Sequence, residues 1–127
     1  MTVRYSEDLQ HCVVEIEVDG RVGREDFDAI APRLEAAITA CGTIRLIEIV
    51  RRLDGVEASL FRDGLKLDMR VLTKISHCAV VGDIGWLSPV AKAAGAIVST
   101  RLRTFPLARE AAARDWIANA GAWSVGP

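Results

Sequence analysis

Apolar and polar residues alternate near the start of the chain. Every second position between His11 and Asp19 is apolar, namely Cys12, Val14, Ile16 and Val18. A period of two predicts a half-buried strand over His11–Asp19. Thr2 to Tyr5 is a candidate edge strand, and the polar residues Ser6 to Gln10 are typical of a turn. Together these stretches predict an antiparallel hairpin.

The period then changes to three or four residues, which is the period of an amphipathic helix. Glu25–Cys41 shows it first, with acidic residues in its first turn and Gly42 directly after its end. Pro32 lies within this stretch and predicts a bend, because proline removes one backbone hydrogen bond from a helix. The same period predicts three more helices, over Phe61–Leu72, Leu87–Ala94 and Leu107–Ala120.

Two other stretches are apolar almost throughout, which is typical of central strands covered on both faces. They predict strands over Ile44–Val50 and His77–Gly82, and Val98–Phe105 is predicted as the last strand. Strands that alternate with helices imply right-handed crossovers and a parallel sheet. We therefore predict one α/β domain over residues 1–127: a mainly parallel sheet of four to five strands, an antiparallel N-terminal hairpin and four helices. The expected core residues are Val14, Ile16, Phe27, Leu34, Leu46, Phe61, Leu65, Val80 and Trp116.

Charge and segment length restrict the classes of partner. The 127 residues include 16 lysines and arginines against 17 acidic residues, which gives a net charge of −1. Near-neutral charge removes the electrostatic argument for a nucleic-acid partner. The apolar stretches are far shorter than the roughly 20 residues of a membrane span, and the N-terminus indicates no signal peptide. We therefore expect a cytoplasmic protein with no membrane span.

The three cysteines, Cys12, Cys41 and Cys78, form no C-x-x-C pair and lie among apolar neighbours. They are interpreted as reduced, buried thiols in a reducing compartment. A zinc site built from His11-Cys12 and His77-Cys78 is not expected, because adjacent residues in a strand point to opposite faces. No metal and no cofactor are therefore predicted.

Catalytic signatures are missing from the sequence, which has neither a Gly-x-Ser-x-Gly elbow nor a His-Glu-x-x-His helix. We therefore predict that the chain is not an enzyme. The basic residues Arg51, Arg52, Arg101 and Arg103 are interpreted as separate charges on a solvated face.

A glycine and an aspartate, Gly82 and Asp83, directly follow the last residues of a predicted central strand, and Trp86 comes three residues later. Glycine suits a tight strand-to-helix turn, and the Asp83 carboxylate can accept hydrogen bonds from the first free amides of a helix. The alternative is a binding role, because ligands of open parallel sheets gather at the carboxyl ends of the strands. We predict a structural turn in which Asp83 caps the following helix and Trp86 packs over the end of the sheet.

Four motifs carry a resemblance to a known family: Gly20-x-x-x-x-Glu25-Asp26-Phe27, Asp63-x-x-Lys66, Cys78-Ala79-Val80-Val81-Gly82-Asp83-x-x-Trp86 and Asp115-Trp116-Ile117. They resemble the SpoIIAA-like family of small bacterial STAS/SEC14-type domains, over nearly the whole chain. The resemblance implies a β-α superhelical sheet, and it implies no particular reaction.

Two groups within this resemblance imply different functions. Anti-sigma factor antagonists of the STAS type bind a partner kinase and are phosphorylated on a serine in an Asp-Ser-Ser-Gly-Leu motif. Here the corresponding stretch runs from Asp54 to Leu60 without that motif, and Ser59 is the only residue that carries over as a regulatory position. The alternative for Ser59 is a helix N-cap. SEC14-type proteins instead carry an apolar ligand between sheet and helices.

The leading hypothesis is therefore a non-enzymatic, cytoplasmic regulatory or protein-interaction domain, with a protein partner or a second copy of the chain. The alternative is a carrier or sensor of a small apolar, lipid-like ligand.

Overall fold

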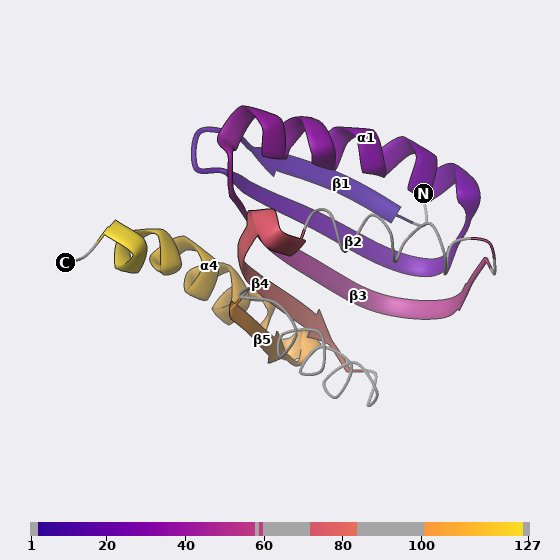
Figure 1. Cartoon of the computed structure of the whole chain (residues 1–127). Coiled ribbons are helices and arrows are strands. Elements are labelled where there is room, and N and C mark those ends of the chain that lie inside the picture. Colours follow the sequence, from indigo (N-terminus) through magenta and orange to yellow (C-terminus); the bar gives the residue numbers. More distant parts are fainter. Residues whose placement is uncertain (1–2, 58, 60–71, 84–100, 126–127) are drawn as a thin grey trace.

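A five-stranded mixed sheet lies at the centre of the computed structural model, which describes residues 3–57, 59, 72–83 and 101–125. The strands follow the order β1-β2-β3-β4-β5 across the sheet (Figure 1). β1 is antiparallel to β2, and the other neighbours are parallel. The predicted α/β class and N-terminal antiparallel hairpin are confirmed. The strand bounds are Val3–Asp8, Val13–Val22, Ile44–Val56, Ile75–Gly82 and Arg101–Phe105.

The hairpin turn lies later in the chain than predicted. β1 continues to Asp8, so the predicted turn over Ser6 to Gln10 is wrong in its first half. His11 and Cys12 belong to the turn instead of β2. The Asp8 carboxylate accepts hydrogen bonds from the His11 amide at 3.2 Å and from its ring Nδ1 at 2.7 Å. Cys12 has a φ of 56°, which ends the extended backbone there.

β2 and β3 are both longer than predicted. Their parallel pairing continues to Val22 and Val56 through register shifts at Val18/Asp19 and Gly20/Arg21. Such irregularities let a strand continue where the alternation of apolar and polar residues is interrupted. The predicted ends at Asp19 and Val50 were therefore too early.

Two α-helices are found in the described part of the chain, where four were predicted for the whole. α1 spans Arg24–Cys41 and continues through Pro32. α4 spans Glu110–Val125 and follows a 3-10 turn, η2, at Leu107–Arg109. The helix therefore begins after the predicted Leu107 and ends after the predicted Ala120. The helices predicted over Phe61–Leu72 and Leu87–Ala94 lie outside the described residues, apart from a short 3-10 turn, η1, at Leu72–Lys74.

The two helices cover opposite faces of the sheet. α1 packs on β1, β2 and β3, while α4 packs on β3, β4 and β5 (Figure 1). Alternate residues of β3 therefore serve different clusters: Leu46 packs with Leu34 of α1, and Ile47 packs with Ile117 of α4. This double burial explains why β3 and β4 are apolar almost throughout.

Most of the predicted core is confirmed. Val14, Leu34, Leu46 and Val80 are buried. Ile16, Phe27 and Trp116 are partly buried and pack against the two clusters. Phe61 and Leu65 lie outside the described residues.

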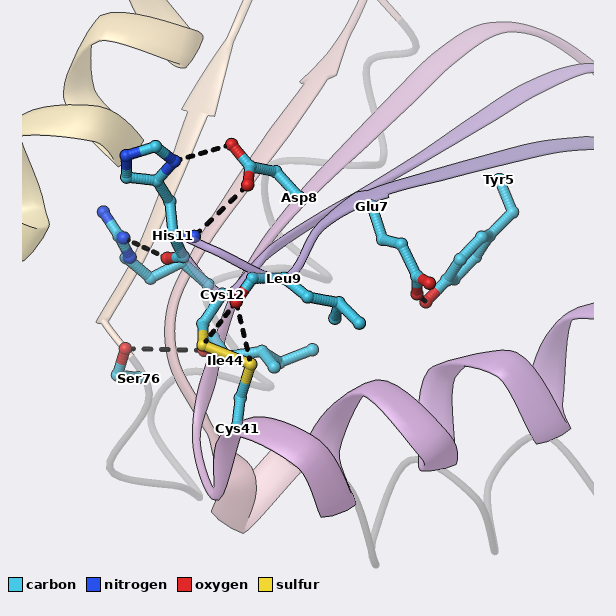
Figure 2. Close-up of a disulfide and its surroundings, with 10 residues drawn as sticks. Tyr5, Glu7, Asp8, Leu9, His11, Cys12, Cys41, Ile44 and Ser76 are labelled. Atoms are coloured by element: carbon cyan, nitrogen blue, oxygen red, sulfur yellow. Dashed lines mark hydrogen bonds and ion pairs between the residues drawn. A yellow bond between two sulfur atoms is a disulfide. The ribbon is translucent and has the colours of Figure 1, made fainter.

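The prediction of three reduced thiols is wrong for two of them. Cys12 and Cys41 form a disulfide that joins the β1–β2 turn to the end of α1, and their Cα atoms are 5.9 Å apart (Figure 2). Cys78 is a free, buried thiol, as predicted. The pairing was missed because the two cysteines are 29 residues apart and meet only when α1 lies along the hairpin. Disulfides are typical of oxidising environments, so the thiols no longer support a cytoplasmic location, which stays a prediction.

Removing this disulfide should lower stability. A crosslink over 29 residues restricts the unfolded chain, so reductant should lower the free energy of unfolding by about 2–4 kcal/mol. Urea denaturation with and without reductant measures the loss. The Cys12→Ser/Cys41→Ser double variant is the control, because reductant should not change its stability. Three titratable thiols in the denatured, unreduced protein would contradict the disulfide.

Candidate functional site

A groove of about 540 Å³ lies between the β4–β5 end of the sheet and α4. It is the candidate functional site of the described structure. Its lining residues are His77, Arg101, Arg103, Phe105, Arg109, Ala112, Asp115, Trp116, Asn119 and Ala120.

The alternation of β5 determines one wall of the groove. Arg101, Arg103 and Phe105 line it from the α4 side, while Leu102 packs with the cluster beneath α1. β5 pairs with β4 only, among the described strands, and its α4-side residues Arg101 and Arg103 are exposed, whereas Phe105 is buried against α4. The wall therefore combines charged side chains with one buried aromatic ring.

α4 forms the opposite wall. Its small residues Ala113 and Ala120 and the larger Ile117 are buried against the sheet, so the helix approaches closely. Trp116, on the same helix, is only partly buried and lines the groove. The rings of Trp116 and Phe105 lie 6.2 Å apart between centroids, which provides an apolar surface within the groove.

His77 contributes a nearly buried polar group from β4, with 8% of its surface exposed. Its ring meets the Trp116 ring edge-on at 5.7 Å, and its Nδ1 lies 3.0 Å from the Ser76 hydroxyl. Burial lowers the pKa of His77 below its ordinary value, and the guanidinium groups of Arg101 and Arg45 lower it further. The groove therefore presents a neutral imidazole near neutral pH.

Arginines dominate the charge of the groove. Arg101, Arg103 and Arg109 line it against a single acidic residue, Asp115. The Arg103 guanidinium carbon lies 4.9 Å from the centre of the Phe105 ring. Arg101 and Arg103 are both exposed, as the interpretation of a solvated face expected, and the structure adds that they line this groove. The signal was present in the period-two spacing of Arg101, Arg103 and Phe105, which places all three on one face of a strand.

A chain of ion pairs holds α4 against the sheet beside the groove. Arg51 contacts Glu17 and also Glu110, the latter at 2.7 Å. Arg114 contacts Glu110 at 2.7 Å and Glu15 at 2.5 Å. Hydrogen bonds from Arg114 and Arg51 lower the pKa of Glu110. Arg51, predicted as a separate charge, therefore belongs to a network that joins β2, β3 and α4.

Arg45 of β3 makes a second connection to α4. Its guanidinium donates to the Ile117 carbonyl and to the His11 carbonyl, each at 2.5 Å. One side chain thus ties α4 to the turn that carries the disulfide.

The predicted turn at Gly82 and Asp83 lies at the carboxyl end of β4, outside the residues that line the groove. The Asp83 carboxylate accepts a hydrogen bond from the Leu107 amide at 3.0 Å. Asp83 therefore secures η2, the turn that leads into α4. The helix that it was predicted to cap, and Trp86, lie outside the described residues.

Ser59 is exposed and lies near the start of α1, not in the groove. Its hydroxyl donates to the Glu57 carboxylate at 3.2 Å, and the other Glu57 oxygen accepts from the Arg24 amide at 2.8 Å. This amide bond is the main cause that lowers the pKa of Glu57. Ser59 therefore touches the residue that caps α1, and its regulatory role stays a prediction.

Metal ligation has no candidate in the described residues, which contain no cluster of three or more histidine, cysteine or acidic side chains suited to an ion. Cys12 is bonded to Cys41 and is therefore not available as a metal ligand.

No helix among the described residues is long and apolar enough to span a membrane.

Comparison with known proteins gives one family and one fold. A family model described as SpoIIAA-like matches residues 13–118. The crystal structure of an uncharacterized protein from the DUF3478 family, with a SpoIIAA-like fold, from Shewanella loihica PV-4, aligns with a TM-score of 0.73. The alignment covers 91% of each chain at 20% identity, so this likeness shows the fold alone. No curated protein matches the chain.

Asp83→Ala should lower the free energy of unfolding by about 0.5–2 kcal/mol, because the first amide of η2 loses its acceptor. Urea denaturation measures the loss. Asp83→Asn is the matched control, since its amide oxygen can still accept the Leu107 hydrogen bond. An equal loss in both variants would contradict the capping role.

His77 should make stability depend on pH. Its pKa is lowered in the folded state, so on acidification the unfolded chain takes up this proton first. Its contribution to stability is therefore complete above the ordinary pKa of 6.5 and is lost as the pH falls toward the folded-state pKa. His77→Gln should reduce the loss of stability between about pH 7 and pH 5, measured by urea denaturation. An unchanged pH dependence would show that His77 titrates normally.

Proposed function

The chain belongs to the SpoIIAA-like family, and from this premise we propose that it is a non-enzymatic binding domain whose groove beside β5 holds a small organic ligand. The observation that supports this proposal is the groove itself. Its volume of about 540 Å³ lies within the range of roughly 300–1,000 Å³ that is usual for small-molecule sites.

The lining has the mixture that ligand sites require. Phe105 and Trp116 offer apolar surface, and the arginines, His77 and Asn119 offer a few polar groups that can orient a bound molecule. The charged groove favours a compact ligand with an apolar ring over the long acyl chain of a lipid. A regulatory role through protein contacts is proposed on the family resemblance only.

Filling the groove should abolish binding. Native mass spectrometry of the protein purified from cells should detect a small-molecule adduct. Asn119→Trp places a large ring in the groove and should remove the adduct. Ala118→Trp is the matched control, because Ala118 is an exposed neighbour on α4 that does not line the groove.

A fragment screen by amide NMR tests the same site when no adduct survives purification. Hits should shift the indole N–H signal of Trp116 in the original chain and not in Asn119→Trp. Ligands that bind equally to both proteins, or a screen in which no fragment shifts a groove residue, would contradict the proposal.

A further inference from the structure

We infer that the ligand of the groove carries an oxyanion, a phosphate or carboxylate group, which Arg101, Arg103 and Arg109 hold while its apolar part lies against Trp116. This inference rests on the proposed function, in which the groove binds a small ligand, and it adds the chemical class of that ligand.

Five arginines elsewhere in the described structure, Arg24 among them, are matched by acceptors. Arg51 and Arg114 are paired with glutamates, Arg52 lies 3.1 Å from Asp54, and Arg45 donates to backbone carbonyls. By contrast, no carboxylate among the described residues lies within ion-pair distance of the three groove arginines. Arg4, Arg21 and Arg33 also lack such a carboxylate in the described part of the chain, but Arg101, Arg103 and Arg109 are gathered around one groove.

The lining charge is unbalanced in the same direction. Three guanidinium groups face one carboxylate, that of Asp115, so the lining carries a net charge of +2, with His77 neutral. The whole chain has a net charge of −1, so this excess is local. A concave surface lined by one sign of charge concentrates ions of the opposite sign.

The spacing of the arginines suits one small anionic group. Arg101 and Arg103 are two residues apart on one face of β5, roughly 6.5 Å along the strand. Arg109 enters from η2, at the start of the opposite wall. Guanidinium groups bind carboxylate and phosphate oxygens through paired, charge-assisted hydrogen bonds. The rings of Phe105 and Trp116 then lie beside this position to contact a planar apolar group.

Three matched probes test the inference: 1-naphthyl phosphate, 1-naphthoate and the uncharged 1-naphthol. In amide NMR titrations at low salt, an anionic probe should shift the Trp116 indole signal and bind at least tenfold more tightly than 1-naphthol. The tighter of the two anions identifies the source of the oxyanion, phosphate or carboxylate.

Arg101→Gln and Arg103→Gln should each weaken binding of that anion about tenfold. Arg4→Gln is the control of equal charge, because Arg4 lies on β1 at the far edge of the sheet and should change affinity less than twofold. Equal binding of 1-naphthol, or an equal loss in Arg4→Gln, overturns the oxyanion inference and leaves the groove proposal standing. Failure of all three probes to shift any groove residue overturns the inference, and the Asn119→Trp comparison then decides the groove proposal separately.

Discussion

Burial of both faces of β3 and β4 is the constraint on which the rest of the structure depends. In β3, Ile44 and Leu46 face α1, while Ile47 and Ile49 face α4. In β4, Cys78 and Val80 likewise face α1, while Ala79 and Val81 face α4. Leaving either face in water would forfeit the main favourable contribution to folding. A helix is therefore needed on each side of the sheet.

The two helices cover different parts of the sheet. This offset produces the ion-pair network on one side of α4 and the groove on the other. α4 lies over β3 to β5, so the same face of β2 is covered by charged side chains that pair with Arg51 and Arg114. On the other side of α4, Arg101 and Arg103 of β5 are exposed, and the groove lies between β5 and the helix. The ion pairs and the groove thus lie on either side of one helix. The ion pairs and the groove both arise because one helix, α4, covers only part of a twisted sheet.

The same offset gives the groove its chemical character. β5 pairs with β4 only, among the described strands, and its Arg101 and Arg103 are exposed on the face that α4 covers. Aromatic rings supply the apolar part of the groove, where Phe105 is buried and Trp116 is partly buried.

The sequence by itself determined the class of fold and most of its elements. Period-two and period-three-to-four patterns are local, so they located the starts of β2, β3, β4, β5 and both described helices to within about three residues, and the SpoIIAA-like motifs agreed with them. Strand ends were less predictable, because the bulges that extend β2 and β3 depend on the partner strand. Only the tertiary structure decided the disulfide, the partner of Asp83 and the groove. Each of these features joins two residues that are far apart in sequence: Cys12 with Cys41, Asp83 with Leu107, and His77 with Trp116. Their meeting depends on which helix covers which strand, and local periodicity carries no information about that.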